Sequence, residues 1–364
     1  MASEADSRKI KLGLAAVVAA SILFSAKSVF YKICYRYGTP PVVLQMLRGL
    51  FSLPFYLFPF LMARLRSAEK RPVPMTGKDM LIVAWLGFSG YYLAAILDMV
   101  GLQYVSAGME RLILYVYPTL VVLFTAWIFR KKIPRSMLVP LLLTYAGIAF
   151  SFGGESAGAH GSGAGNRPYF GGTMVFLSAV FYALFLVWQG KMVHRLGPQR
   201  LAAGCMMASV ACICVQFFAC YPLHALRQTA SVYWIAGLTS VFCNVLPIYL
   251  YGYGVQWVGA GRAAVVSSVG PVSTMVLAGF LLGEHPGFPQ LAGLALVVFG
   301  TLRLGAVKEK EQAADWTAEG GAAKADQAGP AGGLAAVPAP APAAVPAASA
   351  TAASAAVSEN GGFT

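Results

Sequence analysis

The chain has 364 residues, of which 58% are apolar and 11% are charged, and its formal net charge is +13. Soluble domains carry about 25% charged residues, so this composition excludes an ordinary soluble protein and indicates one that crosses a membrane several times. The basic residues lie in short loops beside apolar runs, as in membrane proteins, and no basic stripe with interleaved aromatics occurs in the sequence. We therefore expect no nucleic-acid partner.

Ten apolar runs follow one another along the chain. Each has the roughly 20 residues that a helix needs to cross a hydrocarbon core of about 30 Å. The first run follows Arg8, Lys9 and Lys11, but it is too long for the apolar region of a signal peptide, so we expect an uncleaved first span. The pattern predicts an all-α membrane protein with ten transmembrane helices, at residues 12–33, 41–63, 79–101, 105–129, 136–153, 169–190, 201–222, 232–253, 260–282 and 288–305.

An internal repeat relates the two halves of the chain. Residues 102–118 (LQYVSAGMERLILYVYP) and residues 255–271 (VQWVGAGRAAVVSSVGP) align without a gap, and each segment ends in a proline near the middle of a span. Each half then holds five spans, and an odd number turns the second half upside down relative to the first. We therefore predict two inverted five-helix repeats, an arrangement typical of transporters built from two related halves.

The predicted repeats set the domain boundaries. The first repeat covers residues 1–153 and the second covers residues 168–305. Between them, residues 154–167 are rich in Gly and Ser and predict a flexible linker. Residues 306–364 are charged and then rich in Ala and Pro, which predicts a disordered cytoplasmic tail rather than an eleventh span.

Loop charges predict how the chain lies in the membrane. If the N-terminus is cytoplasmic, the loops on that side hold 20 basic residues and the loops on the other side hold four. Cytoplasmic loops carry an excess of Lys and Arg, so we expect both termini in the cytoplasm.

The sequence resembles the drug/metabolite transporter superfamily, EamA type, over about residues 10–305. The resemblance is carried by the ten spans in two halves, the central prolines of the fourth and ninth spans, Lys32, the segment Tyr37-Gly38-Thr39-Pro40, and Arg48. The family often has Trp-Gly in the first span, where this chain has Phe24-Ser25. The resemblance implies a secondary carrier of small metabolites in a bacterial inner membrane, commonly an exporter, that hydrolyses no ATP. It also implies that the fifth and tenth spans lie at the periphery or at a homodimer contact.

Five charged side chains stand out because they lie well inside the predicted spans: Lys27, Arg48, Asp98, Glu110 and Arg111. An ionisable group in a bilayer is costly unless it is paired or hydrated, so its presence points to a role. Four different helices bring these residues to a similar depth, which predicts a polar chamber or an outer gate. The cations exceed the anions by one, which favours a substrate with a carboxylate or phosphate, and Asp98 or Glu110 is placed to take up a coupling proton. The alternative is a set of structural ion pairs or snorkelling side chains.

Pro118 and Pro271 lie near the middle of the fourth and ninth spans. A proline frees a backbone carbonyl, and interrupted helices near the midplane are where transporters bind substrate; the alternative is a tolerated kink. The candidate cavity residues are therefore Lys27, Arg48, Tyr115, Tyr117, Pro118, Trp188, Asn244, Ser267 and Pro271, and the candidate coupling or gate residues are Asp98, Glu110 and Arg111.

The sequence contains no nucleotide-binding loop, no Cys/His spacing of a metal site and no catalytic triad, so we expect no cofactor, no metal and no enzyme activity. These features together predict a secondary active transporter that moves a small, polar, anionic metabolite by alternating access. We expect export, with proton coupling as a further expectation, and the lipid bilayer as the only other partner besides a second copy of the chain. An uncoupled facilitator or channel is the alternative, followed by a membrane-embedded enzyme or assembly factor.

Overall fold

The computed structural model describes residues 4–66, 75–128, 130, 135–157, 167–259, 263 and 266–318. Every regular element in these ranges is helical. In chain order they are α1 (Glu4–Arg36), α2 (Pro41–Arg66), α3 (Gly77–Leu86), η1 (Gly87–Leu93), α4 (Ala94–Gly101), α5 (Ala107–Leu114), α6 (Tyr117–Ile128), η2 (Arg135–Met137), α7 (Leu138–Ala157), α8 (Pro168–Leu196), α9 (Pro198–Cys220), η3 (Leu223–Leu226), α10 (Ala230–Ser240), η4 (Val241–Val245), α11 (Leu246–Val258), α13 (Val269–Leu282) and α14 (Phe288–Ala318).

The helices confirm the predicted all-α membrane fold. Seven helical stretches in the described residues are long and apolar enough to cross a membrane, and they coincide with seven of the predicted spans. Three shorter apolar helices, Leu138–Gly153, Val269–Leu282 and Phe288–Arg303, coincide with the other three. The third and eighth spans are single apolar segments in which a π-helical turn, η1 or η4, joins two α-helices.

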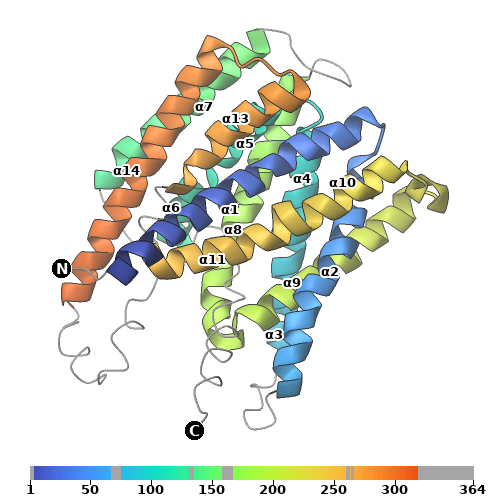
Figure 1. The fold of residues 1–364 in the computed structure, drawn as a ribbon, viewed down its shortest axis with the longest axis horizontal. Helices are drawn as coiled ribbons and strands as arrows, with labels where there is room; N and C mark the ends of the chain where they lie inside the picture. The colour runs from blue at the N-terminus through green and yellow to red at the C-terminus, as the bar shows by residue number, and fades with distance from the viewer. Residues whose placement is uncertain are drawn as a thin grey trace.

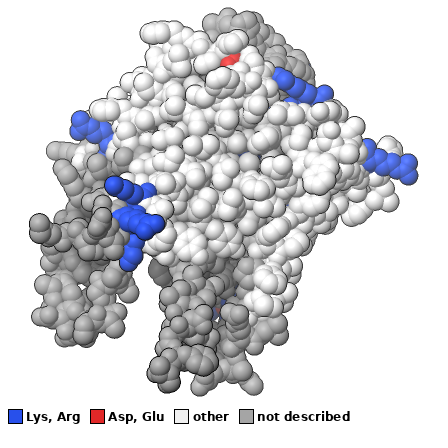
Figure 2. Space-filling model, viewed as in Figure 1, with Lys and Arg blue, Asp and Glu red and all other residues white. Residues whose placement is uncertain are grey.

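Large apolar side chains cover the outside of the bundle. Leu81, Trp127 and Phe280 are 73%, 76% and 85% exposed. On the face drawn in Figure 2 the centre is uncharged, and the Lys and Arg side chains lie toward the margins. Contiguous exposed apolar surface of this kind is rare on soluble proteins, and it suits a hydrocarbon solvent.

The helices of the two halves pack against each other in reciprocal pairs. α1 of the first half contacts α11 and α13 of the second, and α8 of the second half contacts α4 and α6 of the first. α2 packs on α9, and α7 lies side by side with α14 at one edge of the bundle (Figure 1). Exchanging the halves turns the α1 contacts into the α8 contacts and leaves the α2–α9 and α7–α14 pairs unchanged. This reciprocity is what a two-fold repeat produces, and the inverted orientation of the second half stays a prediction.

Glycines allow the closest of these approaches. A Cβ atom on Gly147 of α7 would lie 2.7 Å from the carbonyl oxygen of Gly293 on α14. A Cβ on Gly300 of α14 would lie 2.9 Å from the carbonyl oxygen of Pro140 on α7. Small residues at such crossings let membrane helices meet backbone to backbone.

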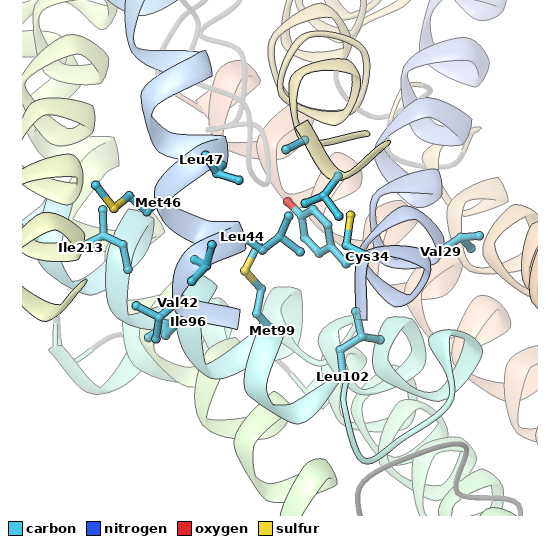
Figure 3. Close-up of a cluster of buried hydrophobic side chains, with 14 of the residues drawn as sticks. Val29, Cys34, Val42, Leu44, Met46, Leu47, Ile96, Met99, Leu102 and Ile213 are labelled. Carbon is cyan, nitrogen blue, oxygen red and sulfur yellow. The ribbon is translucent and has the colours of Figure 1, made fainter. Parts of the chain in front are cut away.

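A hydrophobic core joins α1, α2, α4 and α9 next to the polar residues described below. In Figure 3, Val42 of α2 lies beside Ile96 of α4, and Leu44 of α2 lies beside Met99 of α4. This packing fixes α1, α2 and α4 as neighbours, and these helices carry most of the charged residues that the sequence places inside the spans.

The predicted linker and tail fall mostly outside the described residues. α7 continues to Ala157, and residues 158–166 of the linker are not described. α14 continues past residue 306 to Ala318, so the first part of the expected tail is helical, and residues 319–364 are not described.

Candidate functional site

The start of α5 positions two of the charged residues. The chain turns after α4, and Ser106 caps the new helix, because its Oγ accepts a hydrogen bond from the backbone N–H of Met109 at 3.1 Å. Capping satisfies one of the backbone donors that a helix N-terminus leaves unpaired. The first turns of α5 then place Glu110 and Arg111 in the interior, where they are 0% and 7% exposed.

Lys27 of α1 and Asp98 of α4 form a buried ion pair. The Nζ atom of Lys27 lies 3.2 Å from Oδ2 of Asp98, and their side chains are 14% and 5% exposed. Tyr31 lies one helical turn further along α1, and the centroid of its ring is 5.8 Å from the Lys27 Nζ atom. A charge in a low-dielectric interior has to be compensated, and Asp98 provides this for Lys27.

Ser28 connects α1 to both charged residues of α5. Its Oγ donates a hydrogen bond to Oε2 of Glu110 at 2.6 Å and accepts one from the Arg111 guanidinium at 2.8 Å. Arg111 also donates to the carbonyl oxygen of Phe24 at 3.2 Å, and its Nε lies 3.8 Å from Oε2 of Glu110. The sequence analysis missed Ser28, although its position next to Lys27 on an apolar helix was the available signal.

Arg48 of α2 is the third cation of this cluster. Its guanidinium lies close to the hydroxyls of Tyr31 and Tyr56, and its Nε is buried with no hydrogen-bond partner in the described residues. The ion pairs of the described residues include Lys27 with Asp98 and Arg111 with Glu110, but none that involves Arg48. The structure therefore brings together the five residues that we predicted, and within the described chain it leaves Arg48 without an acidic partner.

A second polar contact joins the two proline-containing spans. The first span of this pair is interrupted between Leu114, where α5 ends, and Tyr117, where α6 begins. The Tyr115 hydroxyl in this break donates to the carbonyl oxygen of Ser267 at 2.8 Å. Ser267 lies four residues before the buried Pro271, and a proline has no N–H to bond the carbonyl at that position. Tyr115 supplies a donor in its place.

The remaining predicted residues lie around these contacts at different places. The Tyr117 ring, next to Pro118, packs edge-on against Tyr115 and against Tyr182, with centroids 6.3 and 5.4 Å apart. Asn244, in η4, donates to the Ser52 Oγ of α2 at 3.2 Å.

Trp188 lies on α8, 39% exposed, and its ring contacts the Lys191 ammonium at 5.4 Å. The structure gives Trp188 no contact with the charged cluster within the described residues, so its role as a lining residue stays a prediction.

Glu284 is a further charged residue that the sequence analysis missed. It lies between α13 and α14, and its Oε1 is 2.9 Å from Lys32 Nζ, near the end of α1. Its Oε2 accepts a hydrogen bond from the backbone N–H of Ala107, the first residue of α5, at 2.9 Å. Nearby, Arg36 donates to the carbonyl oxygen of Leu282 at 2.6 Å. One carboxylate thus joins α1, α5 and the loop after α13 at one end of the bundle.

Within the described residues no group of three His, Cys, Asp or Glu side chains is arranged to hold a metal ion. The charged cluster consists instead of three cations and two carboxylates with hydroxyl groups between them. Its chemistry suits the binding of an anion or a proton.

Comparisons with known proteins match the chain to transporters over almost its whole described length. A family model described as the EamA-like transporter family matches residues 11–153 and 169–305. The uncharacterized transporter YcbK of Bacillus subtilis is 30% identical over 305 residues, which cover 80% of this chain and 92% of the relative. A second protein of that organism, the uncharacterized transporter YetK, is 26% identical over 67% of this chain and 73% of its own length. A solved structure titled only as the crystal structure of a protein is similar in fold, with a TM-score of 0.55 at 18% identity, over 84% of this chain and 98% of that one.

Proposed function

Because the chain belongs to the EamA-like transporter family of the drug/metabolite transporter superfamily, we propose that it moves a small, polar, anionic metabolite across the membrane by alternating access. The assignment of an anionic substrate rests on the environment of Arg48. Its guanidinium lies among helices, and within the described residues its Nε is buried with no hydrogen-bond partner and no acidic side chain pairs with it. An uncompensated cation at membrane depth is costly, and an anionic substrate would compensate it.

The other charged residues have supporting roles in this proposal. Lys27 and Arg111 are held by Asp98 and Glu110, so they contribute to the positive potential without being the primary anchor. The interrupted helices at Pro118 and Pro271 act as the hinge, and Tyr115 couples them through Ser267. The hydroxyl of Tyr117 and the amide of Asn244 are further polar contacts for the substrate. Asp98 or Glu110 takes up the coupling proton.

We propose export as the direction of transport and the bacterial inner membrane as the location, with both termini in the cytoplasm. The inside-negative potential drives an anion outward with about 2.3 kcal/mol per charge for every 100 mV. The two halves are inverted repeats that rock around the charged cluster. α7 and α14, which pack on each other at the edge of the bundle (Figure 1), are the proposed homodimer contact.

Metabolite counterflow in proteoliposomes tests the anchor. Vesicles are loaded with a pool of anionic metabolites, and uptake of labelled pool members is compared for the wild type, Arg48→Ala and Arg48→Lys. Arg195→Gln is the matched control, because Arg195 is 55% exposed and pairs with Asp79 away from the cluster. We expect Arg48→Ala to abolish exchange, Arg48→Lys to retain part of it, and the control to behave as the wild type. Unchanged exchange in Arg48→Ala would overturn the proposal that Arg48 anchors the substrate.

The same vesicles separate the coupled carrier from the uncoupled facilitator. Imposing a pH gradient should alter uptake by the wild type if Asp98 or Glu110 carries a coupling proton. Exchange that is insensitive to the gradient, and to Glu110→Gln, would instead favour a facilitator.

A further inference from the structure

Two carboxylate oxygens in the charged cluster are buried and have no hydrogen-bond donor among the residues that the structure describes. Asp98 is 3% exposed and Glu110 is 0% exposed. Oδ2 of Asp98 is occupied by Lys27 and Oε2 of Glu110 by Ser28. The other two oxygens, Oδ1 of Asp98 and Oε1 of Glu110, have no partner in the described residues. Leaving a buried acceptor unsatisfied costs about 1–3 kcal/mol, and more for a charged group.

The two carboxyl groups lie next to each other. Each is held by one of two consecutive residues of α1, Lys27 and Ser28, and the two side chains are within hydrogen-bonding reach of each other. Two ionised carboxylates at such a separation repel strongly in a medium of low dielectric constant. A pair of this kind holds one proton between its members, as other carboxylate dyads do.

We propose that Asp98 and Glu110 form one proton-binding site, in which a single proton is shared between an oxygen of each carboxyl group. At any moment the proton is covalently bound to an oxygen of one carboxyl group and donated in a hydrogen bond to an oxygen of the other. It passes between these two positions, so it satisfies both unpartnered acceptors and removes the repulsion between the carboxyl groups. When the proton leaves, two carboxylates remain, and Lys27 and Arg111 compensate them. The site itself follows from the contacts of the pair, whereas its part in transport rests on the proposed function.

The charged groups around Asp98 and Glu110 determine how the shared proton changes the affinity of the cluster for an anion. The titratable or charged neighbours are Lys27, Tyr31 and Tyr35 on α1, Arg48 on α2, Arg111 on α5 and Cys243 in η4, and the described α13 segment brings none. Three cations and two carboxylates give the cluster one positive charge, and the shared proton raises it to two. The proton therefore strengthens the binding of an anion, and by linkage the anion strengthens the binding of the proton to the same degree. This linkage favours movement of proton and anion together over their exchange. An anion with at least two negative charges then keeps a net negative charge when it moves with one proton, and the inside-negative potential still drives it outward.

Infrared difference spectroscopy of the purified wild-type protein tests the shared proton without any substitution. Spectra at low and high pH are compared for protein labelled with carbon-13 in its aspartate carboxyl groups, in its glutamate carboxyl groups, or in neither. A shared proton gives a carboxylic-acid carbonyl band that shifts with both labels. A band that shifts with only one label, or no carboxylic-acid band at any pH, would overturn the proposal.

Substitutions then assign the band to this pair. Asp98→Asn and Glu110→Gln should each remove it, because a side-chain amide can donate to the remaining carboxylate, which then stays ionised. Asp79→Asn is the control that should leave the band in place, because Asp79 pairs with Arg195 and not with the cluster. A band that survives both Asp98→Asn and Glu110→Gln belongs to other residues and contradicts the site.

The transport arm distinguishes this inference from the proposed function. Counterflow of the anion pool should be faster with protons on the same side as the labelled anion, and in Glu110→Gln its rate should no longer depend on the side that holds the protons. A wild type that shows the doubly shifted band but exchanges no anion would overturn the proposed function and support the proton site. Faster exchange with protons on the opposite side would overturn cotransport.

Discussion

The Tyr115 hydroxyl donates a hydrogen bond to the carbonyl oxygen of Ser267 at 2.8 Å, and this contact joins the interrupted helices of the two halves. Each partner is at the break of its own span, just before Pro118 or Pro271. Pro271 has no N–H that could donate to the Ser267 carbonyl oxygen, and the Tyr115 hydroxyl donates to that oxygen. We expect this bond to couple a movement at one break to the other.

Replacing Tyr115 with Phe removes this bond and keeps the ring. We expect the loss of about 1 kcal/mol of stability that a single hydrogen bond provides, together with a lower rate of counterflow because the two breaks are uncoupled. Tyr117→Phe is the matched control for stability alone, since the Tyr117 hydroxyl makes no hydrogen bond in the described residues and its ring packs beside Tyr115. Thermal unfolding in detergent and counterflow in vesicles measure the two effects. Equal unfolding midpoints of the two variants would mean that the contact does not stabilise the bundle, and wild-type counterflow in Tyr115→Phe would mean that it does not couple the two breaks.

The Lys27–Asp98 ion pair leads to a prediction about how charge compensation affects the stability of the protein. Lys27→Met leaves Asp98 buried without its cation, and breaking a buried ion pair from one side costs about 3–5 kcal/mol. The double variant Lys27→Met/Asp98→Asn leaves no uncompensated charge, so it should recover much of the loss. The midpoint of thermal unfolding is compared for the single and double variants. If the double variant is no more stable than Lys27→Met alone, the pair is not what stabilises this part of the bundle.

Several features of the fold were predictable because they depend on local composition. The length of each apolar run predicted the spans, and Pro118 predicted the interruption between α5 and α6. The charged cluster was predictable for a similar reason, since charges such as Lys27 and Asp98 are rare within apolar helices and therefore tend to meet.

The missed residues have contacts that the local sequence does not encode. Ser28 bonds Glu110 across 82 residues, and Lys32 pairs with Glu284 across 252 residues. A serine in an apolar helix usually bonds its own backbone, so the position of Ser28 next to Lys27 is its only mark in the sequence, and this position does not show that Ser28 bonds α5. The sequence also could not show that Arg48 lacks an acidic partner in the described residues. Only the packing of the helices reveals that Asp98 and Glu110 pair with Lys27 and Arg111 instead.

The contacts of Glu284 lead to a prediction about how easily a thiol reagent reaches Cys34 at one end of the bundle. Glu284→Gln removes the ion pair with Lys32 but keeps an oxygen to accept from the Ala107 N–H, so the cap of α5 survives while α1 is released. We expect maleimide labelling of Cys34, which is 0% exposed two residues after Lys32, to become several-fold faster. Peptide mass spectrometry measures Cys34 against the exposed Cys220 in the same molecule.

The control for this prediction is Arg195→Gln, which removes the Asp79 ion pair. Asp79 is in the first turn of α3, after α2 has crossed the bundle, so this pair is at the opposite end from Lys32. Labelling of Cys34 should be unchanged in this variant. If both variants or neither of them accelerate labelling, the Glu284 contact does not close this end specifically.

The α7–α14 contact gives a prediction in which two Gly→Ala substitutions have opposite signs. A Cβ atom on Gly293 would lie 1.9 Å from Ser151 Oγ and 2.3 Å from the Gly147 carbonyl oxygen, and this backbone atom cannot move without shifting α7. Gly293→Ala should therefore destabilise the protein by about 1–3 kcal/mol, the range for overpacking. Gly237→Ala in α10 meets nothing within 4 Å, so it should be neutral or stabilising by roughly 0.5–1 kcal/mol, the helix preference of Ala over Gly. Thermal unfolding in detergent distinguishes the two signs, and a stabilising Gly293→Ala would contradict the close backbone approach of α7 and α14.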